Sequence, residues 1–176
     1  MNEQTRKMIL DWMRKIHQLE YAHRFESISY AQMEKYFGIS AFVFATLITF
    51  SYQFPKADTE VFEQVCFIFR PDFLIPLAST IVAILTGLIT FLKPSERAET
   101  HKKTANNYEK LRHRIELILT GNFLSNDLDK ELNNVREEWE NLDAINVSDK
   151  YFKKGKEKAQ SFNKYPKELD FLEDVN

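Results

Sequence analysis

The residues of this chain that could carry chemistry are few, and none has a diagnostic spacing. The histidines are His17, His23, His101 and His113. They form no H-E-x-x-H or comparable metal-binding pattern, and the single cysteine, Cys66, excludes both an internal disulfide framework and a cysteine-based zinc site. His101 lies on an apolar helical stripe, so we interpret it as a packing histidine. We therefore expect no metal and no cofactor.

Motifs of the common enzyme classes are absent as well. The chain contains no G-x-S-x-G, no Walker A motif and no G-x-G-x-x-G. The acidic run 137–140 (Glu-Glu-Trp-Glu) is better explained as an exposed helix face than as a catalytic site. With 24 Lys and Arg against 26 Asp and Glu, the chain lacks the basic excess that nucleic-acid binding requires. We expect neither an enzyme nor direct binding to nucleic acid.

Two segments without any charged residue determine the expected fold class. Residues 36–55 and residues 73–92 contain no Asp, Glu, Lys or Arg. Each is apolar all round, and as a helix each would span roughly 30 Å, the thickness of the hydrocarbon core of a bilayer. The absence of ionisable groups argues against proton-coupled transport. The alternative is a pair of buried core helices, but so small a bundle would struggle to cover two fully apolar helices.

Basic residues near the two segments predict their orientation. The intervening loop, 56–72, has only two of them, Lys56 and Arg70, and is acidic overall. Eight flank the segments on the other side: Arg24, Lys35, Lys93, Arg97, Lys102, Lys103, Lys110 and Arg112. This asymmetry predicts that both termini are cytoplasmic and that the loop lies outside. Within the loop, the apolar run 65–69 either lies at the outer interface or extends the second helix.

The segments on the cytoplasmic side read as helices. Residues 1–35 have an apolar stripe at helical spacing, and residues 95–120, within the region 93–160, mirror it. The stripe of the second helix is Ala98, His101, Ala105, Tyr108, Leu111, Ile115 and Ile118. We expect an all-α membrane protein: a two-transmembrane helical hairpin that continues as cytoplasmic antiparallel helices, with the two stripes facing each other.

Further signals define the ends of these elements. The helix 95–120 begins with Ser95 as its cap or with Pro94 in its first turn, and Gly121-Asn122 ends it. We expect another helix at 127–145, capped by Asn126 or Asp127, and a short lysine-rich helix at 149–160. The tail, 161–176, either packs on the bundle or docks on a partner.

Four basic residues invite a further interpretation, contact with anionic lipid or with an anionic messenger. They are Lys102, Lys103, Arg112 and Arg114. A solvated helix face explains them better.

Small residues recur at helical spacing in both apolar segments. They are Gly38, Ala41, Ala45, Thr49, Ser79, Ala83, Thr86, Gly87 and Thr90. Small side chains let helix backbones approach, and hydroxyls can form hydrogen bonds between helices. We expect the two faces to pack against each other within the hairpin. The alternative is that one face packs between subunits or lines a pore, and a pore requires an oligomer because two helices cannot enclose a water path.

The arrangement resembles the SLATT domain, a bacterial two-transmembrane effector domain of defence systems. A charged helix, 12–24 (Trp-Met-Arg-Lys-Ile-His-Gln-Leu-Glu-Tyr-Ala-His-Arg), precedes the first segment, and a short loop separates the two segments. The second segment ends in Phe-Leu-Lys-Pro at 91–94, and the next helix carries a Tyr-x-x-Leu at Tyr108 and Leu111. The resemblance covers about residues 5–145.

This resemblance implies a membrane effector of the bacterial inner membrane. Such a protein would oligomerise when an upstream sensor fires and would open a pore or disrupt the membrane, killing or arresting an infected cell. The expected partners are membrane lipid, further copies of the chain, and a sensor protein or nucleotide messenger that the sequence does not identify. The alternatives are a membrane-anchored adaptor that recruits a cytoplasmic partner and a small ligand-gated channel.

Overall fold

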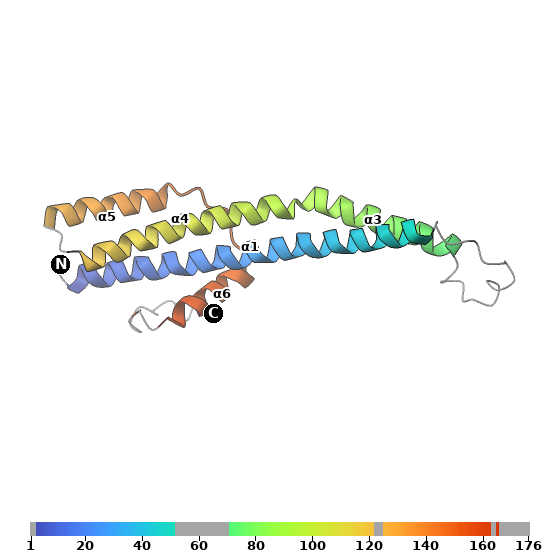
Figure 1. Cartoon of the computed structure of the whole chain (residues 1–176). Coiled ribbons are helices and arrows are strands. Elements are labelled where there is room, and N and C mark those ends of the chain that lie inside the picture. Colours follow the sequence, from blue (N-terminus) through green and yellow to red (C-terminus); the bar gives the residue numbers. More distant parts are fainter. Residues whose placement is uncertain (1–2, 52–70, 122–124, 163–164, 166–176) are drawn as a thin grey trace. The chain divides into compact units, whose positions relative to one another are not determined.

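The computed structural model of the chain describes residues 3–51, 71–121, 125–162 and 165. Its helices are α1 (Glu3–Ser51), α3 (Pro71–Leu92), α4 (Pro94–Thr120), α5 (Ser125–Glu140) and α6 (Asp149–Gln160) (Figure 1). The described residues contain no strand, so the expected all-helical fold is confirmed. Residues 52–55 of the first apolar segment, and 56–70 of the loop with its apolar run 65–69, lie outside the described residues.

The chain divides into two compact units. One consists of Met1–Ser29 with Arg97–Asn176, and we call it the polar unit; the other is Tyr30–Glu96, the apolar unit. Helix α1 continues from the first into the second without a break because no proline interrupts it and its first glycine is Gly38.

The break between α3 and α4 has a local cause. Pro94 begins α4, and a residue that precedes proline is disfavoured in the right-handed helical region. Lys93 accordingly adopts a left-handed backbone with φ of 46°, while its N–H still donates to the Ile89 carbonyl at 3.0 Å. The structure thus has Pro94, not Ser95, at the start of the helix, and a single residue separates two long helices.

The core of the polar unit lies between the first half of α1, α4 and α5. It is built from apolar side chains spaced three and four residues apart on each helix: Ile9, Met13, Ile16, Tyr108, Leu111, Ile115, Ile118, Leu128, Leu132 and Val135. Trp12 and Trp139 meet edge to face at its margin, with ring centroids 6.2 Å apart. The apolar stripes of α1 and α4 therefore share one core, as an antiparallel pair of helices requires.

The helix expected at 127–145 is shorter and begins earlier. It runs from Ser125 to Glu140, so neither Asn126 nor Asp127 is its cap. After Glu140 the chain turns, with the N–H of Leu142 donating to the Trp139 carbonyl, and Leu142 and Ala144 then pack against the core from outside the helix. The expected helix loses its last turn because the chain leaves it after Glu140 and buries these two apolar residues instead. The lysine-rich helix, α6, has the expected bounds, 149–160.

Helix α6 approaches α1 so closely that only glycine fits at the contact. A Cβ on Gly155 would lie 2.5 Å from the Gln18 carbonyl oxygen and 2.8 Å from the Ala22 nitrogen. Ala159, one turn later, is buried as well. Beyond α6, the Phe162 ring stacks on the His17 ring with centroids 4.9 Å apart, so the start of the tail packs on the bundle.

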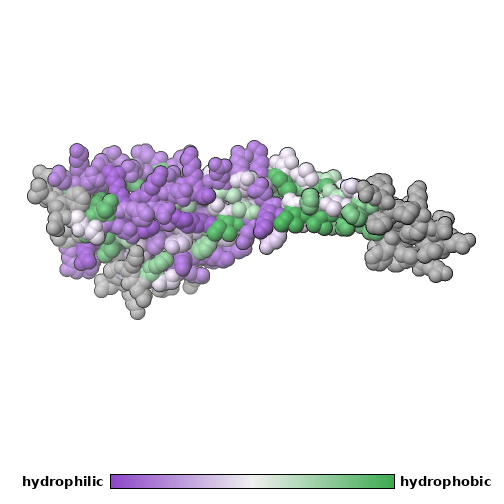
Figure 2. Space-filling view, viewed as in Figure 1, coloured by the Kyte–Doolittle hydropathy of each residue, from purple (hydrophilic) through white to green (hydrophobic). Residues whose placement is uncertain are grey.

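The two helices of the apolar unit leave their apolar segments largely exposed. Its two helices are long and apolar enough to cross a membrane, and no residue of either apolar window is buried. Exposed side chains include large aromatic ones, such as Phe42, which is 72% exposed. In the view of Figure 2, hydrophobic residues predominate on this unit, whereas the polar unit is mostly hydrophilic with a few hydrophobic patches. These helices lack the burial of ordinary core helices.

We predict that Gly155→Ala detaches α6 from α1. Alanine in an open helix position is favoured over glycine by about 1 kcal/mol, but here its Cβ would collide with backbone atoms that cannot rotate away. Tryptic cleavage after the lysines of α6 should become faster. Gly87→Ala is the matched control, because a Cβ at Gly87 meets nothing within 4 Å. Equal cleavage of both variants would contradict this packing.

Candidate functional site

The small residues of the apolar unit do not lie where the sequence led us to expect. Eight of the nine are exposed: Gly38, Ala45, Thr49, Ser79, Ala83, Thr86, Gly87 and Thr90. Only Ala41 is half-buried. A Cβ placed on Gly38 or Gly87 would meet nothing within 4 Å. The two small-residue faces therefore do not pack against each other within one hairpin.

Larger side chains take most of the half-buried positions instead. These positions recur at three-and-four spacing on both helices: Phe37, Ser40, Ala41, Phe44 and Ile48 on α1, and Ile75, Ala78, Ile81, Val82, Leu85, Ile89 and Leu92 on α3. This is the spacing of a helix–helix seam. The expected contact was wrong because each helix has two different faces, and bulky aliphatic and aromatic side chains fill the space between helices better than glycine and alanine do.

The threonine hydroxyl groups on the exposed faces are satisfied within their own helices. Thr49 donates to the Ala45 carbonyl at 2.9 Å, Thr86 to the Val82 carbonyl at 2.8 Å and Thr90 to the Thr86 carbonyl at 2.9 Å. Each bond joins a threonine to the residue four positions earlier. The exposed faces can therefore lie in an apolar surrounding without leaving these hydroxyl hydrogens unpaired.

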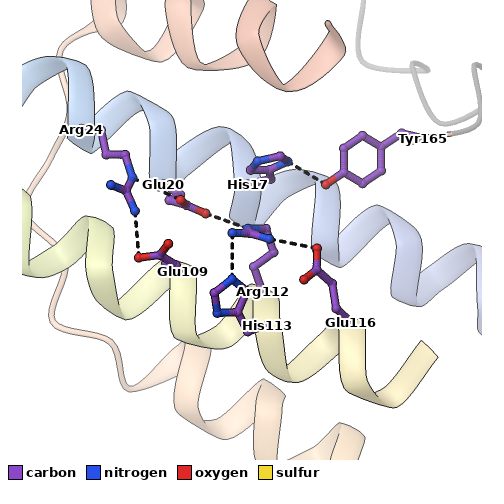
Figure 3. A network of polar contacts seen from close by, with 8 residues as sticks. All are labelled: His17, Glu20, Arg24, Glu109, Arg112, His113, Glu116 and Tyr165. Carbon is purple, nitrogen blue, oxygen red and sulfur yellow. Dashed lines mark hydrogen bonds and ion pairs between the residues drawn. The ribbon is translucent and has the colours of Figure 1, made fainter. Parts of the chain in front are cut away.

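A buried ion-pair network connects α1 and α4 in the polar unit (Figure 3). Arg112 donates through Nε to Glu20 at 2.8 Å and through Nη1 to Glu116 at 2.9 Å. The Glu20 side chain is only 4% exposed and that of Arg112 13%. Burial by itself would lower the pKa of Arg112, but the hydrogen bond and the charge of Glu20, together with Glu116, outweigh it and raise the pKa. This pair is charged and fixed.

Two further contacts extend the network along α1. Arg24 bridges Glu20, at 3.1 Å, and Glu109 on α4, at 2.8 Å. His17 is hydrogen-bonded through Nδ1 to the hydroxyl of Tyr165 at 2.8 Å, and burial raises the pKa of that tyrosine. Figure 3 shows the ion-pair side chains between the two helices, with the Tyr165 ring directed toward His17. The polar unit thus has a network of polar contacts beside its apolar core, and this network fixes the register of α1 against α4.

A second buried contact joins α1 to α4 through two histidines. The Nδ1 atoms of His23 and His101 are 3.0 Å apart, and the two residues are 1% and 3% exposed. The Tyr108 ring stacks on His23 with centroids 5.6 Å apart. A hydrogen bond between two Nδ1 atoms holds one proton, so one ring donates and the other accepts.

The environment of this histidine pair favours the neutral forms. Burial, reinforced by the charge of His101, lowers the pKa of His23 to about 4. Burial also lowers the pKa of His101, although the nearby Glu26 carboxylate opposes the shift. At neutral pH both rings are therefore uncharged.

The described residues offer no metal site. No group of three or more His, Cys, Asp or Glu side chains among them is arranged to hold an ion. The two facing histidines supply at most two ligands, and their Nδ1 atoms already share a hydrogen bond. Zinc sites in proteins use three or four protein ligands.

The four basic residues considered for anion contact differ in their surroundings. Arg112 is held by Glu20 and Glu116, and Arg114 by Glu131 and Glu138 at 2.9 and 2.6 Å. Lys102 and Lys103 are exposed. Both arginines form their ion pairs inside the polar unit, where they tie α4 to α1 and to α5.

The structure buries all seven residues of the predicted stripe, Ala98, His101, Ala105, Tyr108, Leu111, Ile115 and Ile118. The sequence alone pairs neither His101 with His23 nor Glu20 with Arg112, and it indicates no role for Gly155. One signal was available: His23 and His101 both lie on apolar stripes of helices expected to be antiparallel neighbours. The partner of Glu20 had no such signal, because charged residues occur at every turn of both helices.

Comparisons with known proteins identify no relative of this chain. No family model matches the chain, and neither the curated proteins nor the solved structures contain a significant match.

We predict that acidification destabilises the polar unit through His23. In the unfolded chain a histidine takes up a proton near pH 6.5, whereas folded His23 does so only near pH 4. The stabilisation is therefore complete above pH 6.5 and is lost as the pH falls toward 4, amounting to about 2 kcal/mol between pH 7 and 5. Thermal unfolding followed by circular dichroism measures it.

The double variant His23→Met and His101→Met should flatten this pH dependence. His113→Gln is the control for loss of an imidazole, because His113 is exposed and contacts Arg112, not either ring of the pair. A double variant with the slope of the wild type would show that other groups cause the pH dependence.

We predict that the Glu20–Arg112 pair is strongly coupled. Glu20→Leu leaves a buried guanidinium with one of its two carboxylates and should cost about 3–5 kcal/mol, whereas the double variant with Arg112→Leu should recover a large part of that. Chemical unfolding of the single and double variants gives the coupling energy. Arg136→Ala, which removes an exposed pair with Glu140, should cost under about 1 kcal/mol. Additive losses from Glu20 and Arg112 would contradict the coupling.

Proposed function

We propose that this chain is a non-enzymatic membrane effector. In this proposal the two apolar helices cross the inner membrane of a bacterium, with both termini in the cytoplasm, and several copies assemble through the exposed small-residue faces. Assembly then opens a pore or disrupts the bilayer when a partner sensor triggers it. The observation that carries the proposal is an apolar hairpin in which eight of the nine predicted small residues are exposed and lie outside its own seam.

Membrane insertion is supported by the energetics of the apolar unit. Large apolar side chains such as Phe42, Leu47 and Phe91 are 72%, 59% and 85% exposed in the described chain. In water, each such side chain would lose roughly 1.5–3 kcal/mol relative to an apolar surrounding. A bilayer supplies that surrounding around the whole circumference of both helices, and each helix satisfies its own backbone hydrogen bonds.

Assembly between copies is supported by the position of the small residues. Ser79, Ala83 and Gly87 lie four residues apart on α3 and leave a shallow face with open space above Gly87. In lipid, such faces let the backbones of neighbouring helices approach closely. Since the seam within the hairpin uses other residues, the small faces are available to a second copy.

The polar unit is suited to receive the trigger. Its helix α1 is unbroken between Glu3 and Ser51 and therefore links the polar unit to the first apolar segment through one continuous helix. Buried, direction-specific contacts such as Glu20–Arg112 and His23–His101 fix the register of α1 against α4. Breaking them would let the two helices slide or rotate, and such packed elements tend to have discrete arrangements.

The resemblance to SLATT domains supports the same function. In that family, effectors of this layout act in antiviral defence and respond to an upstream sensor or to a nucleotide messenger. For this chain we propose abortive infection of the same type, with the sensor supplied by another protein.

We predict that Gly87→Leu or Ala83→Leu abolishes toxicity without preventing membrane insertion. Either substitution places a bulky side chain on the small face while keeping the helix apolar. Depolarisation of cells that express the chain with its genomic neighbours, read with a voltage-sensitive dye, measures activity, and membrane fractionation measures insertion. The control is Ile84→Leu, a conservative change at a position that is 57% exposed and outside the small face.

Other outcomes would favour other functions. If the wild type never depolarises cells even with its neighbours, the effector proposal fails. If activity survives replacement of both spans by unrelated apolar helices, the chain is a membrane-anchored adaptor. Ion flux without any trigger would indicate a small channel with a housekeeping role.

A further inference from the structure

Helix α6 carries a concentrated positive charge on its outer side. It contains Lys150, Lys153, Lys154, Lys156 and Lys158 against only Asp149 and Glu157, a net charge of +3 within Asp149–Gln160. Its buried side is formed by Gly155 and Ala159, which pack on α1. Lys150, Lys153 and Lys154 are exposed on the first turns of the helix, away from that contact.

Within the part of the chain that the structure describes, these lysines have no carboxylate partner, in contrast to three arginines of the polar unit. Arg24, Arg112 and Arg114 each hold two carboxylates. Among the described residues, no carboxylate oxygen lies within 4.0 Å of the ammonium group of any α6 lysine. Lys150 and Lys154 instead lie beside the Tyr151 ring, at 5.2 and 5.8 Å from its centroid. Among the described residues, the charge of this face is therefore left uncompensated.

Three contacts fix the direction of α6 along α1. The N–H of Ser148 donates to the Glu26 carboxylate at 3.0 Å, and the Tyr151 hydroxyl donates to Ser29. Further along, Gly155 packs on Ala22. The two helices thus run antiparallel, and the lysine-rich start of α6 lies at residues 26–29 of α1. In the sequence, Ser29 is only seven residues before the charge-free segment begins at Tyr36.

Helix α4 also contacts this part of the polar unit, residues 26–29 of α1. The Ser27 hydroxyl donates to the Ala98 carbonyl at 2.7 Å, and Ala98 follows the second charge-free segment by six residues. Residues 26–29, the start of α4 and the start of α6 are therefore one connected region, and both apolar segments begin or end within a few residues of it along the chain.

We propose that the exposed lysines of this region, Lys150, Lys153 and Lys154, bind the phosphate-bearing headgroups of anionic lipids at the cytoplasmic membrane surface. The proposal rests on the membrane insertion proposed above. A lipid headgroup fits better than a soluble anion because the lysines form an open, convex face, on which several separate phosphates can each neutralise one ammonium group. Proteins bind a single soluble phosphate compound with a pocket of backbone N–H groups or with the fork of an arginine side chain. This lysine face has neither.

The test is hydrogen exchange of the full chain in lipid nanodiscs. One set of discs contains phosphatidylcholine alone, and in the other about a third of the lipid is phosphatidylglycerol. We expect the amides of α6 to exchange about five-fold more slowly in the anionic discs, and about 0.5 M NaCl to remove the difference. Amides of α5 serve as the internal reference and should exchange equally in both. Equal exchange of α6 in the two lipids overturns the proposal.

Matched variants separate this face from the overall charge. The triple variant Lys150→Gln, Lys153→Gln and Lys154→Gln should lose the slowing in anionic discs. The triple variant Lys102→Gln, Lys103→Gln and Lys110→Gln removes the same charge from exposed positions of α4 and should keep it. If both variants lose the slowing, or if inorganic phosphate reproduces it in discs of phosphatidylcholine alone, lipid binding by this face is refuted. Failure of membrane insertion would appear separately, as chain that stays in solution and does not enter the discs.

Discussion

Two helices without a charged residue in their apolar parts expose bulky hydrophobic side chains such as Phe42 and Phe91, and no residue of either apolar window is buried in the described chain. The free energy of this surface in water is the constraint on which the other features depend. It restricts charged residues to the remaining segments, and it requires the hydroxyls of the apolar unit to form hydrogen bonds within their own helices, as Thr49, Thr86 and Thr90 do. It also leaves the small residues available for other copies of the chain, on which the proposed function depends.

The polar unit is organised on a different principle. Its apolar core is of ordinary composition, but the contacts that distinguish one register of α1 and α4 from another are polar and buried. Glu20 with Arg112 and His23 with His101 are directional, so sliding by one turn would bury a charge or an imidazole without its partner. Such contacts specify an arrangement more sharply than they stabilise it.

The junctions of the helices add two constraints of shape. Pro94 forces Lys93 into the left-handed region and separates α3 from α4 by one residue, whereas α1 has no such break. Gly155 lets α6 lie against the backbone of α1, which holds the lysine-rich face beside residues 26–29. Each feature depends on one residue, Pro94 in the first case and Gly155 in the second. Replacing that residue would change the helix geometry more than the change in side-chain size suggests.

The sequence by itself determined the helical class, the two apolar segments and the stripes of α1 and α4, because each depends on local periodicity and on the distribution of charge along the chain. It also predicted the bounds of α6 and the end of α4 at Gly121. The tertiary structure alone decided which face of each apolar helix forms the seam, since small and bulky faces both repeat every three to four residues. It likewise decided the partners of Glu20 and His23, where α5 ends, and why position 155 is glycine. These depend on which residues far apart in the chain come within a few ångströms of each other, and no local pattern encodes that distance.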